Sequence, residues 1–112
     1  MTDDDFRAFV LRFPETSESE HEGMPTFHVR GKRFATLGWP KPHKVAIVLG
    51  VEEQEVLLAA CPQAFERAAG SWGVRGHSHL DLAVADDATV RSVISMAWRR
   101  SVPARLAKSF EA

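Results

Sequence analysis

His77, His79 and Asp81 are the residues whose types and spacing come closest to a reactive site. Residues two apart in an extended strand point to the same face, so all three side chains would share one surface. Such groups could bind a metal ion or exchange protons, but a metal site needs further ligands and covalent catalysis needs a nucleophile. The neighbouring sequence offers neither, and no P-loop, GxGxxG or GxSxG motif occurs. We therefore predict no catalytic residue, metal ion or cofactor.

A basic stretch, MPTFHVRGKRFATLGWP at residues 24–40, is the second chemical feature. Two segments rich in apolar residues flank the sequence RGKR, a pattern typical of a β-hairpin with a charged turn. Gly31 supplies the backbone freedom that a tight turn requires. Arg30, Lys32 and Arg33 would then be free to contact phosphate groups. Alternatively, Arg30 or Lys32 folds back onto acids at the start of the chain.

The three tryptophans have different expected roles. Trp98 lies on the apolar face of a predicted helix and is expected in the core. Trp72 follows Gly70 in a glycine-rich segment, where it is either a core plug or an exposed platform. Trp39, close to Lys41, is either a cap on the sheet or an aromatic that stacks on or wedges between nucleic-acid bases beside a cation.

Charge is distributed in blocks although the net charge is only −1. Residues 1–22 carry seven acids and two bases, whereas residues 23–51 carry five bases and no acid. Residues 52–87 again carry seven acids and two bases, and residues 88–108 carry five bases and no acid. If folding brings the two basic blocks together, the protein has a basic face; otherwise each block pairs with an acidic neighbour.

Length and composition indicate one small globular domain spanning residues 1–112, with apolar residues at 45%. No apolar run is long enough for a membrane span, and the acidic start MTDDDFR does not resemble a secretory signal. The single cysteine, Cys61, lies in an apolar context and is expected to be a buried thiol. We therefore expect a cytoplasmic, monomeric protein without a membrane partner.

Hydrophobic periodicity predicts a mainly antiparallel α+β fold with helices packed on one face of the sheet. The expected order is helix, strands, helix, strand, helix, helix. Residues 17–23 form an edge strand or a loop, and residues 70–76 form a turn or loop. The predicted core contains Phe6, Phe9, Val10, Phe13, Ile47, Leu49, Leu82, Val93, Ile94 and Trp98.

The segment GMPTFHVRGKRFATL, residues 23–37, resembles the central signature of the MmcQ/YjbR family, Gly-x-Pro-Thr-Phe-x-Val-x-Gly-Lys-x-Phe-Ala. Trp72-Gly73, Gly76, Ala97-Trp98 and SVPARL also fall where the family has related residues. His77 departs from the pattern, because the family usually has tryptophan there, and Val102 and Arg105 replace the usual alanine and lysine.

The resemblance implies an antiparallel sheet flanked by helices, as in frataxin (CyaY) and the secretion chaperones, in a small bacterial protein. It also implies DNA binding through basic hairpins. The lack of a catalytic constellation separately predicts a protein without enzymatic activity. The alternative is a protein-interaction or chaperone-like module with no nucleic-acid role. The residues expected to contact duplex DNA are Arg30, Lys32, Arg33, Trp39, Lys41, Arg99, Arg100 and Arg105.

Overall fold

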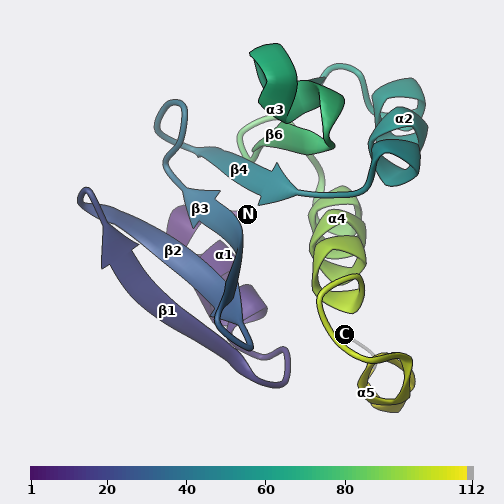
Figure 1. The fold of residues 1–112 in the computed structure, drawn as a ribbon. Coiled ribbons are helices and arrows are strands. Elements are labelled where there is room, and N and C mark those ends of the chain that lie inside the picture. Colours follow the sequence, from purple (N-terminus) through teal and green to yellow (C-terminus); the bar gives the residue numbers. More distant parts are fainter. Residues whose placement is uncertain (111–112) are drawn as a thin grey trace.

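The computed structural model describes residues 1–110, which form a six-stranded antiparallel sheet in the order β1-β2-β3-β4-β6-β5 (Figure 1). The strands are β1 (Thr16–His21), β2 (Met24–Val29), β3 (Lys32–Leu37), β4 (Lys44–Val48), β5 (Phe65–Arg67) and β6 (His77–Asp81). Each of the first three strands pairs with the next. The chain then leaves the sheet, and β6 pairs with β4 while β5 forms the far edge.

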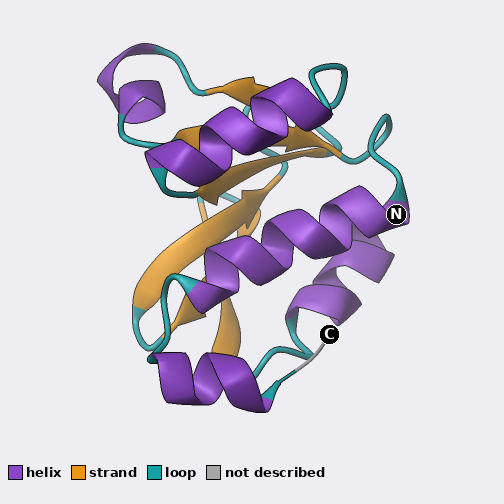
Figure 2. Ribbon diagram, turned by 90° about the vertical axis from the view of Figure 1, so that its right-hand side faces the viewer, coloured by secondary structure: helices purple, strands orange, loops and turns teal. Residues whose placement is uncertain are grey.

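The helices in the described residues are α1 (Asp3–Val10), α2 (Val51–Ala60), α3 (Gly70–Val74), α4 (Asp87–Arg99) and α5 (Ala104–Ser109). Side-chain caps begin two of them, because Thr2 accepts a hydrogen bond from the Asp5 N–H of α1 and Asp86 accepts one from the Thr89 N–H of α4. Viewed from the side, helices lie in front of the strands (Figure 2). The predicted α+β class and antiparallel sheet are therefore confirmed.

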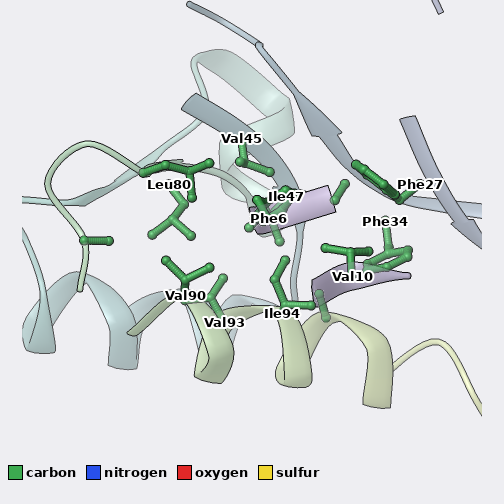
Figure 3. Close-up of a cluster of buried hydrophobic side chains, with 14 of the residues drawn as sticks. Phe6, Val10, Phe27, Phe34, Val45, Ile47, Leu80, Val90, Val93 and Ile94 are labelled. Carbon is green, nitrogen blue, oxygen red and sulfur yellow. The ribbon is translucent and has the colours of Figure 1, made fainter. Parts of the chain in front are cut away.

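One hydrophobic core lies between α1, α4 and a single face of the sheet. Figure 3 shows Val90, Val93 and Ile94 of α4 pointing towards the strands that carry Ile47 and Leu80. All ten residues predicted for the core are buried. The burial of Trp98 is complete, and its indole N–H donates a hydrogen bond to the Pro14 carbonyl oxygen at 3.0 Å.

The structure differs from the sequence expectation between α2 and β6. Residues 70–74, expected in a turn or loop, form the short helix α3, and β5 was not predicted. β5 has only three residues, too few for an alternating pattern to be recognised. At the other edge of the sheet, residues 17–21 belong to strand β1, so the edge-strand alternative is correct. No helix within residues 1–110 is long and apolar enough to cross a membrane.

We predict that Trp98→Ala lowers the free energy of unfolding by about 3–5 kcal/mol, because it empties a large volume in the core. Val56→Ala, at an exposed position of α2, is the control and should cost no more than about 0.5 kcal/mol. Chemical denaturation measures both values. Equal losses in the two variants would contradict the assignment of Trp98 to the core.

Candidate functional site

The second face of the sheet is covered by neither α1 nor α4, and we call it the open face. In antiparallel strands, directly paired residues lie on the same side of the sheet. Val45 and Ile47 of β4 point into the core, so Ala46 and Val48 between and after them point to the open face. Thr36 pairs with Ala46 on one side, and His79 pairs with it on the other. These pairings place two small side chains, Thr36 and Ala46, at the centre of the open face, beside the imidazole of His79.

A hollow of about 530 Å³ lies on the open face. Its floor includes Thr36, Ala46 and Val48. Trp39, from the β3–β4 loop, and Trp72, from α3, also line it. The β3–β4 loop and α3 stand at the top of Figure 1, to the left and right of β4. Both indoles are about half exposed, at 50% and 57%, so neither serves mainly to fill the core.

Trp72 is held in place by its neighbours. Its ring makes an edge contact with the His77 ring, at 4.9 Å between centroids, and the Arg75 guanidinium lies 5.7 Å from the indole centroid. The next residue, Gly73, packs directly against the backbone before α3, because a Cβ atom there would lie 1.9 Å from the Ala68 carbonyl oxygen. Short helix α3 therefore sits close to the chain leaving β5.

A buried glutamine, Gln54 of α2, fixes the backbone on both sides of this contact. Its amide nitrogen donates hydrogen bonds to the Gly73 carbonyl at 2.9 Å, the His77 carbonyl at 3.1 Å and the Ser78 hydroxyl at 2.9 Å. Its side-chain oxygen accepts a hydrogen bond from Arg67 at 3.1 Å. Because Gln54 is 1% exposed, these bonds lie away from water and hold α2, α3, β5 and β6 in one arrangement.

Positive charge gathers at the end of the open face where β6 begins. The pKa of His77 is lowered first by burial of the imidazole and then by the charges of Arg33, Arg75 and Arg100. Three arginines, from β3, the end of α3 and the end of α4, are therefore close enough to disfavour protonation of the same imidazole. At this end, aromatic rings and cations share one surface.

Another part of the open face carries a cluster of paired charges. Glu66 of β5 accepts a hydrogen bond from Lys44 at 3.2 Å and lies 3.5 Å from His79. The lysine, and to a smaller extent the histidine, holds the pKa of Glu66 below its usual value. As predicted from their spacing, His77 and His79 point to the same face. Residues 1–110 contain no cluster of three or more residues suited to holding a metal ion.

Arg30 does not have the free position expected from the sequence. Its guanidinium donates two hydrogen bonds to Glu15, at 2.8 and 3.1 Å, and this pairing lowers the pKa of the Glu15 carboxyl. Glu15 lies just before β1, and the pairing of β1 with β2 brings it to the Arg30–Gly31 turn. The tight turn itself is confirmed, but for Arg30 the alternative of folding back onto an early acid is correct.

The other predicted contact residues lie in three places. Lys32 and Arg33 are exposed at the start of β3, whereas Trp39 and Lys41 lie beyond its far end. Arg99, Arg100 and Arg105 lie at the end of α4 and in α5, and Arg100 forms an ion pair with Glu53 at 3.4 Å. Of these residues, the hollow is lined by Arg33 and Trp39.

Comparison with known protein families shows which family the chain belongs to. A family model described as YjbR matches residues 11–100. The chain belongs to the YjbR family. No curated protein and no solved structure matched it.

The YjbR signature has a structural explanation here. Phe27 and Phe34 are buried in the core, and the Arg30–Gly31 pair forms the β2–β3 turn with positive φ at both residues. Lys32 is different, because its side chain is exposed and makes no ion pair within residues 1–110. His77, at the position where the YjbR pattern usually has tryptophan, makes the ring contact with Trp72.

Two features of this site were not predicted from the sequence. The exposure of Trp72 was an open alternative, and the role of Gln54 was not recognised because its partners lie 13 to 24 residues away. One clue was present in the isolated glutamine of α2, VEEQEVLLAA, on the side of the helix that carries buried Leu57.

We predict that His77 makes the stability of the protein dependent on pH. Its pKa is lower in the fold than the ordinary value of 6.5, so the unfolded chain binds more protons as the pH falls. This contribution to stability is therefore present above pH 6.5 and is lost as the pH falls through the folded-state pKa. His77→Gln should flatten the dependence of the unfolding free energy on pH between about pH 7.5 and 5.

Chemical denaturation at several pH values measures this effect, with His21→Gln at the exposed end of β1 as the matched control. Identical pH dependence in wild type and His77→Gln would contradict the prediction.

Proposed function

We propose that the protein is a non-enzymatic DNA-binding protein and that the open face, with the adjoining β2–β3 turn, is its contact surface. The observation that carries the proposal is the grouping of Trp39, Trp72 and Arg33 around one hollow. Aromatic rings beside cations are the groups with which proteins hold bases and phosphates. Family membership is compatible with this proposal.

The local charge supports the proposal although the net charge is −1. Several acids are occupied by internal ion pairs, including Glu15 with Arg30 and Glu18 with Arg7. Lys32 and Arg33 make no such pair within the described part of the chain, and Lys41 makes none either. These exposed cations can approach phosphate groups without first losing a protein partner.

The proposal contains no chemical step. Ser78 lies between His77 and His79, two of the histidines that line the hollow, but it is 1% exposed. It also donates a hydrogen bond to the Gly76 carbonyl while accepting one from Gln54. A hydroxyl committed in this way is not positioned beside a base for attack on a substrate.

We also place the protein in the cytoplasm, where DNA is accessible, and propose that it acts as a monomer. The buried free thiol of Cys61, whose pKa is raised chiefly by burial, is compatible with a reducing compartment.

A protein partner is the second candidate, because the hollow exposes apolar surface. Trp39 and Trp72 border it, and Val74 of α3 is 75% exposed. Apolar patches of this kind also mark protein-interaction sites. Binding of such a protein partner would depend far less on the salt concentration than binding of DNA, and this difference distinguishes the two candidates.

The test is binding of a duplex DNA fragment at several salt concentrations, measured by fluorescence anisotropy. In the double variant Lys32→Ala/Arg33→Ala, we expect weaker binding to every duplex and a log K against log salt slope flatter by about 2. The effect should not depend on the DNA sequence, because phosphate contacts do not read bases.

The matched control is Arg12→Ala/Arg91→Ala, which removes the same charge from exposed positions after α1 and on α4. It should leave the slope nearly unchanged. If wild-type protein binds no nucleic acid at low salt, the DNA proposal is wrong.

A further inference from the structure

We propose that the hollow between Trp39 and Trp72 receives an unpaired nucleobase, so that the favoured ligand is a single-stranded nucleic acid rather than a closed duplex. This inference rests on the proposed function and specifies the part of the nucleic acid that enters the site. The indoles provide stacking surfaces, and Arg33 provides the charge for a neighbouring phosphate.

The size of the hollow fits this ligand. About 530 Å³ falls within the range of sites that enclose small molecules of nucleotide size, and is far too little for a double helix. A base inside a duplex is already stacked between its neighbours and paired at its edge, so its faces are not available to an indole. Only a base that is unpaired and turned outward can enter.

The floor leaves room for a planar group. Thr36, Ala46 and Val48 are the strand residues facing the hollow at its centre, and none has a long side chain. Larger side chains surround this centre: Trp39 comes from the loop and Trp72 from α3, and Arg33, His77 and His79 come from the neighbouring strands. A flat ligand can therefore lie in the hollow while its faces or edges contact an indole.

The Trp72 side of the hollow is already arranged before a ligand binds. Gln54 donates hydrogen bonds to the carbonyl groups of Gly73 and His77. The Trp72 ring lies against the His77 ring and close to the Arg75 guanidinium. A ring held in this way loses little conformational freedom on binding. This arrangement also explains the burial of a glutamine, since its hydrogen bonds fix the backbone next to the exposed Trp72.

The cations favour a nucleotide over a neutral aromatic compound or an apolar peptide side chain. Arg33 lines the hollow, and its charge reaches His77 at the same end. Arg75 lies beside the Trp72 ring. A base stacked on Trp72 would therefore bring its phosphate close to these arginines, whose charge is offset only in part by Glu22 on the lining of the hollow, whereas a neutral ligand would gain less from them.

The experiment compares four ligands of defined structure with the full chain at fixed low salt. These are a thymidine oligonucleotide, an abasic oligonucleotide with the same number of phosphates, a hairpin-closed duplex and a thymidine mononucleotide with a 5′-phosphate. Tryptophan fluorescence and anisotropy report binding. We expect the thymidine oligonucleotide to bind most tightly and to quench fluorescence, and the mononucleotide to quench it at higher concentration.

Substitutions of the two tryptophans then test where the base binds. Trp72→Ala and Trp39→Ala should each weaken binding of the thymidine oligonucleotide by roughly 5- to 150-fold, the range measured when one stacking side chain is lost. Trp72→Phe keeps a stacking surface and should retain most of the affinity. Val56→Ala, at an exposed apolar position of α2, is the control and should bind like wild type.

The outcomes separate this inference from the DNA proposal. If the duplex binds as tightly as the thymidine oligonucleotide, or the abasic strand binds equally well, the base pocket is wrong while DNA binding stands. Unchanged affinity in both tryptophan variants leads to the same conclusion. If none of the four ligands binds, both proposals are wrong.

Discussion

The fold depends on the packing of α1 and α4 against one face of the sheet. Each helix has a single apolar stripe, formed by Phe6, Phe9 and Val10 in α1 and by the side chains around Val93 and Trp98 in α4. Together these stripes complete one core, and neither helix extends to the second face. The second face must therefore be compatible with water by its own composition, which explains its threonines, histidines and short side chains. The candidate site exists because the helices cover one side only.

The sequence predicted those parts of the fold that have a strong local pattern. The apolar spacing of α4 and the alternation on either side of Gly31 each identified an element, and the predicted core residues are buried. Local patterns did not identify β5, which is short, or α3, whose glycines oppose a helix prediction. The candidate site was harder to predict. Arg30 meets Glu15 only because of the register between β1 and β2, which composition does not reveal.

The polar network around Gln54 shows how the less regular half of the sheet is held. β5 and β6 form a short ladder, and helix α3 contributes only Gly73 as a buried residue. Hydrogen bonds from one amide group connect these pieces to α2, and Arg67 completes the set from β5. No buried side-chain nitrogen or oxygen in the described residues lacks a partner. Such a network stabilises one geometry and penalises others, since each broken bond would leave a polar group away from water.

Strand β1 is an outer edge of the sheet, and its sequence TSESEH is polar throughout. An unpaired edge can accept a strand from a second molecule and so extend the sheet into an aggregate. Glu18 is already paired with Arg7, but two copies approaching through β1 would bring the Glu20 carboxylates near each other, and repulsion between like charges opposes that pairing. The acidic edge thus discourages the addition of a further strand at β1, whose first residues lie beside the β2–β3 turn.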